Sequence, residues 1–191
     1  MNYKTTIWTR EQYEDFFHTI ISSMLPELDK RLIRPSYQSV GGLAAKNAIN
    51  QQYNDGVSGF TYKDDFIYFR VDFEGYKESF TGYGNPTIQR FVDVSISFYG
   101  ENSALYCLKV ISLIRISAII DMLEKNGLYL YNTDTPSATH ENINNEWWER
   151  HDFKITFNEN LIIEEPESFK ALSADEVALN PGNINVIVIE D

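Results

Sequence analysis

Alternating apolar and polar residues along several stretches of the chain predict β-strands. In the stretch 89–100, the apolar residues that share one face are Val92, Val94, Ile96 and Phe98. The stretches 66–73 and 147–157 repeat this period of two, with Ile67, Phe69, Val71 and Phe73 in the first and Trp147, Phe153, Ile155 and Phe157 in the second. A period of two is typical of a half-buried strand. Shorter apolar runs at 128–131 and 184–189 predict two further strands.

Two other stretches have apolar residues three and four positions apart, which predicts helices with one buried face. The first helix follows Thr9, whose spacing to Gln12 is that of a capping box, and continues to Leu25. The second runs without a break from about Ala104 to Lys125 and ends at the pair Asn126-Gly127. Three charged residues interrupt it, so we expect a core helix and not a membrane span: Lys109, Arg115 and Asp121.

These elements predict an α+β fold, in which a mainly antiparallel sheet of four to five strands packs on two helices. The strands 66–73 and 89–100 are expected to pair as a hairpin around a glycine-rich turn at 82–86. We expect one domain over residues 1–163, with a loop or insertion at 39–58 that orders against a neighbour and a polar loop at 133–145. Residues 164–191 are expected to form an acidic C-terminal extension that ends in the strand 184–189.

The order of these elements resembles the phage neck or tail terminator proteins, which join the tail to the head connector. The resemblance lies in the strand Val92–Gly100, the long helix, the strand Gly127–Tyr131, and Trp148-Glu149-Arg150 at the start of the strand Asp152–Phe157. It implies the tail-terminator-like α+β fold and no catalysis. It also implies a homo-oligomeric ring, most often six-fold, that contacts the tail tube and the head connector or adaptor. The DNA would pass through the lumen of this ring in the virion, after assembly in the host cytoplasm.

The net charge of −12 agrees with DNA passing by and argues against a protein that grips nucleic acid or an anionic membrane. Binding to phosphates needs clustered Lys and Arg, whereas an acidic lumen would repel the phosphates and let the duplex slide. The N-terminus leads into a charged helix and does not resemble a signal peptide. The single cysteine, Cys107, allows no disulfide within the chain and is expected to be a small buried residue.

The residues predict no catalytic, cofactor or metal site. The three histidines (His18, His140 and His151) lie too far apart in the sequence for a metal motif, and Asn102 or Ser103 is expected to cap a helix. Carboxylate pairs such as Asp72 with Glu74 lie near the aromatic residues Tyr76, Phe80 and Tyr83. They leave a carbohydrate-binding or hydrolytic module as an alternative of a different class. A head-completion or tail-tube capping protein is the alternative within the same particle.

Trp148, Glu149 and Arg150 are the main candidates for an interface with another protein. Neighbouring residues on a strand point to opposite faces, so one of Trp147 and Trp148 enters the core and the other lies on the outer face. An exposed Trp beside an Arg is typical of an interface, whereas a Trp148 covered by its own chain would be structural. Further candidates are Tyr76, Phe80 and Tyr83 in the aromatic turn and Ile187 and Ile189 in the last strand. That strand is expected to pair either beside 152–157 in its own sheet or with a neighbouring subunit.

Overall fold

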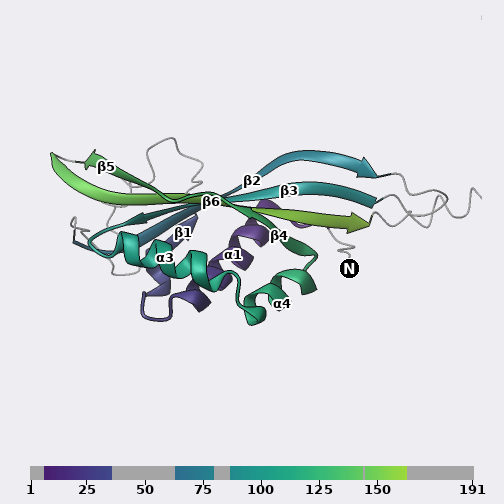
Figure 1. The fold of residues 1–191 in the computed structure, drawn as a ribbon, viewed down its shortest axis with the longest axis horizontal. Coiled ribbons are helices and arrows are strands. Elements are labelled where there is room, and N and C mark those ends of the chain that lie inside the picture. Colours follow the sequence, from purple (N-terminus) through teal and green to yellow (C-terminus); the bar gives the residue numbers. More distant parts are fainter. Residues whose placement is uncertain (1–6, 36–62, 80–86, 144, 163–191) are drawn as a thin grey trace, which may run out of the picture.

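The computed structural model describes residues 7–35, 63–79, 87–143 and 145–162. Figure 1 shows the helices on one side of a long sheet. In chain order the elements are α1 (Arg10–Met24), the 3₁₀ helix η1 (Lys30–Leu32), β1 (Ile33–Pro35), β2 (Phe66–Ser79), β3 (Thr87–Tyr99), α3 (Ser103–Leu113), α4 (Ser117–Lys125), β4 (Leu128–Thr133), β5 (Ser137–Ile143) and β6 (Glu146–Ile162).

The described strands form one six-stranded sheet in the order β1-β2-β3-β6-β4, with β5 also paired to β6. Only β1 and β2 are parallel, and the other pairs are antiparallel. The predicted α+β class is therefore confirmed, as is the hairpin of β2 with β3. The sheet has two strands that were not predicted, β1 and β5. The polar loop expected at 133–145 is wrong over Ser137–Ile143, because backbone pairing with β6 makes this segment a strand in spite of its polar side chains.

β6 is paired along both edges. β3 lies along one edge from Arg150 to Ile162, and the other edge pairs first with β5 and then with β4. The segment between these two strands also follows β6, because Asp134 donates its backbone N–H to the Lys154 carbonyl at 2.9 Å. The place beside 152–157 that was favoured for the strand 184–189 is thus already taken. Residues 184–189 themselves lie outside the described part of the chain.

The core lies between the sheet and the helices. α1 begins with the predicted capping box, in which Thr9 Oγ1 accepts from Gln12 N and Gln12 Oε1 accepts from Thr9 N. Its buried face includes Phe17, Ile20 and Ile21. These side chains pack on one face of β2, β3 and β6, whose buried residues include Phe69, Val71, Val92, Val94, Ile96, Ile155 and Phe157.

The long helix predicted from 104 to 125 is two helices, α3 and α4, bent by 69° with respect to each other. The break falls at Ile116, which adopts an extended conformation with φ −72° and ψ 147°. Ile114 before the break and Ile119 after it are both buried, so the bend lets both helices keep their apolar faces against the sheet. Within the described residues no single helix is long and apolar enough to cross a bilayer, and α3 and α4 meet that criterion only as this bent pair.

A close backbone approach precedes α3. Asp65 accepts from Asn102 N at 2.9 Å and from Asn102 Nδ2 at 2.7 Å, which satisfies donors at the start of the helix. Gly100 has φ +103°, and a Cβ at this position would lie 2.6 Å from the Asp64 carbonyl oxygen. A glycine at position 100 is therefore required by both conformation and space.

Candidate functional site

The two faces of the sheet differ, and the face away from the helices carries aromatic and charged side chains. Even-numbered residues of β6 point to this outer face, because Phe153, Ile155 and Phe157 point to the helices. The outer face has an aromatic cluster near β5 and a row of charged residues farther along β2, β3 and β6.

The aromatic cluster comprises Phe66, Tyr68, Tyr99 and Trp148. Phe66 stacks on Tyr99 with ring centroids 4.7 Å apart, and Trp148 meets Phe66 edge-on at 5.8 Å. Trp148 is only 1% exposed, and among the described residues its buried indole N–H has no hydrogen-bond acceptor. Of the two alternatives for Trp148, the structure agrees with the one in which its own chain covers it. The exposed tryptophan is Trp147, at 67%, which the alternation had placed on the core face.

Arg150 is held between two carboxylates beside this cluster. Its guanidinium lies 2.8 Å from Glu141 on β5 and 2.8 Å from Asp152, and it lies over the ring of Tyr99 at 5.9 Å. Burial by itself lowers the pKa of Arg150, but the hydrogen bond to Asp152 and the neighbouring charges outweigh it, so the net shift is upward. Burial also raises the pKa of Tyr99. Arg150 therefore ties β5 to the sheet within one subunit.

The charged row runs across three neighbouring strands. Asp93 on β3 is 2% exposed and accepts from Lys154 Nζ at 3.0 Å and from Thr156 Oγ1 at 2.6 Å, both on β6. On the other side of β3, Asp72 lies directly opposite Asp93, and Arg70 Nε is 2.6 Å from Asp72. These contacts balance charge across the face, so the row is a polar surface and not a concentrated cationic patch.

A buried polar triad links α1 to the sheet on the helix-covered face. Arg90 Nε lies 2.5 Å from Glu159 Oε2, and Arg90 Nη2 donates to Tyr13 Oη at 2.6 Å. Tyr13 Oη in turn donates to Glu159 Oε1, so each member contacts the other two. Tyr13 and Glu159 are completely buried, and burial together with the hydrogen bond to Glu159 raises the pKa of Tyr13. Every strong polar group of the triad has a partner, which favours a structural role.

Ser103, His151 and Glu149 come together but lack the geometry of a catalytic triad. Ser103 Oγ lies 3.1 Å from His151 Nδ1, and Glu149 lies 3.9 Å from the same nitrogen. A catalytic triad needs the nucleophile and the orienting carboxylate on different ring nitrogens, and Ser103 is completely buried. The described residues also contain no group of three or more His, Cys, Asp and Glu side chains that could hold a metal ion.

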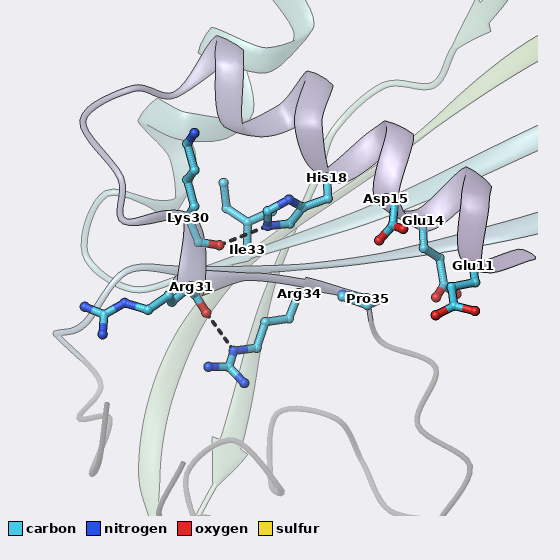
Figure 2. Close-up of a pocket in the computed structure, with 9 residues that line it drawn as sticks. All are labelled: Glu11, Glu14, Asp15, His18, Lys30, Arg31, Ile33, Arg34 and Pro35. Carbon is cyan, nitrogen blue, oxygen red and sulfur yellow. Dashed lines mark hydrogen bonds between the residues drawn. The ribbon is translucent and has the colours of Figure 1, made fainter. Parts of the chain in front are cut away.

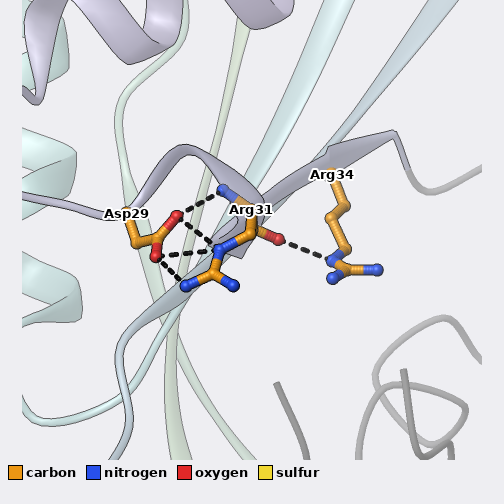
Figure 3. A network of polar contacts seen from close by, with 3 residues as sticks. All are labelled: Asp29, Arg31 and Arg34. Atoms are coloured by element: carbon orange, nitrogen blue, oxygen red, sulfur yellow. Dashed lines mark hydrogen bonds and ion pairs between the residues drawn. The ribbon is translucent and has the colours of Figure 1, made fainter. Parts of the chain in front are cut away.

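A charged groove lies between α1 and the segment η1–β1. Figure 2 shows Glu11, Glu14 and Asp15 descending from α1 and the basic residues Lys30, Arg31 and Arg34 on the other wall. His18 bridges the walls, with Nε2 at 3.0 Å from the Lys30 carbonyl oxygen. The Arg31 guanidinium lies 2.6 Å from the Asp29 carboxylate, and Arg34 Nε donates to the Arg31 carbonyl at 2.7 Å (Figure 3). These contacts shape the groove from within the chain.

The remaining interface candidates are placed only in part. Glu149 is exposed on β6, with 48% of its side chain accessible, and Tyr76 lies in β2 opposite Arg90. Phe80, Tyr83, Ile187 and Ile189 lie outside the described residues. The exposed apolar residues of the described part of the chain that were not among the candidates include Trp147, Leu105 and Leu108. Helical spacing assigned both leucines to one wide apolar face, and only the packing shows that α3 turns them outward.

The sequence matches the model of a known protein family. The model of a family described as phage neck terminator protein matches residues 49–185 of the chain, which is more than half of its length. No curated protein matches the sequence. The chain therefore belongs to the phage neck terminator proteins and is a structural protein of the phage neck that interacts with other head or tail proteins in the virion.

Proposed function

We propose that the chain is one subunit of a ring that closes the head-proximal end of the phage tail and joins it to the head connector. The observation that carries this proposal is the family match, which covers the sheet from β2 to β6 together with α3 and α4. A homo-oligomeric ring, with six-fold symmetry favoured, is what the resemblance implies. In this role the subunit positions other proteins and catalyses nothing.

The shape of the subunit supports a repeated contact between unlike surfaces. At one end β2, β3 and β6 extend past α4, and at the other the pair β5–β6 extends past α3 (Figure 1). Two ends that differ in this way can make a heterologous contact, and such contacts close into a ring when the rotation between subunits allows it. The partners on the two sides of the ring would be the tail tube and the head connector or adaptor.

The charge of the chain supports passage of DNA through the ring without specific binding. The net charge is −12, and the described basic residues on the outer face are paired with carboxylates, as in Arg70 with Asp72 and Lys154 with Asp93. A wall of this kind repels phosphates and offers no cluster of free cations. Assembly in the host cytoplasm would precede passage of the DNA.

The interface residues predicted from the sequence keep different roles in this proposal. Glu149 is exposed and can meet a partner directly. Trp148 and Arg150 would act by holding the β5–β6 pair in place, because both are engaged within the subunit. Direct contacts by Tyr76, Phe80, Tyr83, Ile187 and Ile189 stay predictions.

The test is to remove the protein from the particle. Phage assembly without the protein should yield full heads and tails that do not join. Adding the purified full-length chain to these heads and tails should restore joining. Electron microscopy should then show a ring at the head-proximal end of each tail. Heads that lose their DNA before any tail arrives would instead indicate head completion, and a ring that stays on unjoined tails would indicate tail-tube capping. A monomer that is retarded on polysaccharide gels and is absent from the neck would contradict the proposal in favour of a carbohydrate-binding module.

A further inference from the structure

Two apolar residues of α3 line a shallow groove that is open to solvent. Leu105 is 49% exposed and Leu108 is 60% exposed. Together with Met24 and Leu113 they form the apolar wall of a groove between the end of α1 and α3, and Glu27 and Lys109 lie at its rim. Exposed leucines that lie next to each other in a groove are typical of a protein-binding surface, whereas single exposed leucines are common and need no explanation.

The most exposed tryptophan of the described residues lies on the part of β6 that pairs with β5. Trp147 is 67% exposed and lies opposite Asn142 in this pair. It shares its sheet face with Phe153, Ile155 and Phe157, but the β5–β6 pair extends past the end of α3 (Figure 1). Its indole ring therefore points to the helix side of the sheet where no described helix covers it. Trp is among the residues that most often carry binding energy at interfaces.

We infer that Trp147 of one subunit packs into the α3 groove of the next subunit, against Leu105 and Leu108. The contact belongs to the ring proposed above and rests on that proposal. Trp147 and Leu108 are both largely exposed in one chain, so the contact is not made within the subunit. The two surfaces differ, and one chain carries both, so a second copy supplies the missing half of each. The resulting contact is heterologous, as a ring requires.

The charges at the two surfaces are complementary. Glu149 lies two residues after Trp147 on the same face of β6 and is 48% exposed. Lys109 at the rim of the groove keeps 39% of its side chain exposed while contacting Glu27. With Trp147 in the groove, Glu149 of the same β5–β6 pair can contact Lys109 of the neighbouring subunit. An ion pair at the rim favours the correct orientation of the two subunits and disfavours the wrong partner protein.

The test joins the two surfaces through engineered cysteines in the full-length chain. Trp147→Cys and Leu108→Cys are prepared separately, mixed and oxidised. We expect a disulfide-linked dimer in the mixture and only background linkage with either variant alone. Cys107 does not interfere, because it is 1% exposed. The control pair is Tyr131→Cys with Leu108→Cys, since Tyr131 is also 67% exposed but lies on β4 and not on the β5–β6 pair. If Leu108→Cys does not fold, Leu105→Cys takes its place.

A double variant, Trp147→Cys with Leu108→Cys, decides the symmetry of the contact. A heterologous contact gives a ladder of covalent oligomers that ends at the size of the ring. A covalent dimer without larger species would show a reciprocal two-fold contact and would overturn the inference. Linkage that is no stronger than that of the Tyr131→Cys control would overturn it as well.

Self-association provides the second measurement. Trp147→Ala should weaken association of the subunits by about 30-fold or more in sedimentation experiments, as expected of a central interface residue. Tyr131→Ala should leave association unchanged. A Trp147→Ala protein that associates like the wild type, or a wild type that stays monomeric at every concentration, would overturn the inference. If either result is obtained but a neck ring is seen on tails, the proposed function stands and only the inferred contact fails. If the subunits are linked but no neck ring is found, the proposed function is overturned.

Discussion

Arg90 on β3 lies directly opposite Glu159 on β6, and the 2.5 Å contact between Nε and Oε2 is closed over by Tyr13 of α1. The three side chains fasten α1 to the middle of the sheet through polar contacts inside an otherwise apolar layer. Residues 1–48 lie outside the family match, so this triad joins a segment outside the match to β3 and β6 within it. Arg90 is accessible over 19% of its side chain and Glu159 over none of it.

Removing one member of this triad should be costly, and removing the charges together should not. Glu159→Ala leaves a half-buried guanidinium and a buried phenol without their acceptor, and the free energy of unfolding should fall by ~3–5 kcal/mol. The double variant Arg90→Met with Glu159→Leu should recover most of this loss. Guanidinium denaturation measures both. Equal stability of Glu159→Ala and wild type would show that the triad is solvated in solution.

Alkaline pH should destabilise the protein through its buried thiol. Burial, with a smaller contribution from Asp152, raises the pKa of Cys107 to about 11 from its usual 9.0. Below pH 9 the thiol is protonated in both states. Between pH 9 and 11 only the unfolded chain releases the proton, so the free energy of unfolding should fall as pH rises, by up to about 2 kcal/mol.

Denaturation curves at pH 8, 9 and 10 compare the wild type with Cys107→Ala. The variant should show a flatter decline over this range. Above pH 10 both proteins should decline further, because the pKa values of Tyr13 and Tyr99 are also raised. Parallel declines from pH 8 to 10 would mean that Cys107 ionises as easily in the folded protein as in the unfolded one.

The break between α3 and α4 offers a matched pair of substitutions. Ile119 is 5% exposed, and Ile119→Asp should bury a charge without a partner, at a cost of several kcal/mol that leaves the protein unfolded or insoluble. Ile116 is 44% exposed and occupies the N-cap position of α4 without a side-chain cap. Ile116→Asp should therefore stabilise the subunit by ~0.5–1 kcal/mol. Thermal melting followed by circular dichroism distinguishes the two, and a stable Ile119→Asp protein would mean that α4 does not pack on the sheet.

Arg150→Ala should destabilise the isolated subunit, whereas the interface role predicted from the sequence would affect assembly more than folding. The change leaves Glu141 and Asp152 close together beside Tyr99 without their shared cation. We expect a loss of ~1–3 kcal/mol in a melting experiment. Arg70→Ala is the matched control, because its pair with Asp72 leaves 55% of the Arg70 side chain exposed and should contribute less than ~1 kcal/mol. An unchanged melting temperature for Arg150→Ala would restore the original interface role.

Truncation after Asn180 tests the last predicted strand. Both edges of β6 at 152–157 are occupied, which favours the alternative in which residues 184–189 pair with a neighbouring subunit or with the tail. The truncated subunit should then melt like the full chain and fail to enter rings or join tails. Early melting would indicate docking at another place on its own subunit. Normal melting with normal assembly would make the segment dispensable.

Much of the fold could be predicted because the patterns that indicate its elements involve residues close together in the sequence. The alternation in β3 and the spacing from Thr9 to Gln12 depend on neighbours within a few positions, and both are confirmed. β5 could not be predicted, because its residues have no apolar alternation and it exists through backbone pairing with the adjacent strand β6. The bend at Ile116 was missed because no proline or glycine marks it in the sequence.

The assembly surfaces were harder to predict than the core. Alternation correctly placed Trp147 and Trp148 on opposite faces but could not say how far the helices extend beneath β6. The β5–β6 pair extends past α3, so Trp147 on the apolar face is exposed, whereas Trp148 on the polar face is buried in the aromatic cluster with Phe66 and Tyr99. Periodicity shows which residues share one face of a strand. Only the length of the helix that covers this face shows which of them are buried.

β3 has a mechanical consequence for a protein that joins two parts of a particle. Every residue from Thr87 to Tyr99 is paired with β2 on one side and with β6 on the other. A force along the strands must shear both ladders at once, whereas a force across them would open the ladder one pair at a time. A neck subunit oriented with its strands along the line of tension would carry the load in its most resistant direction, and the sheet would yield last at its central strand.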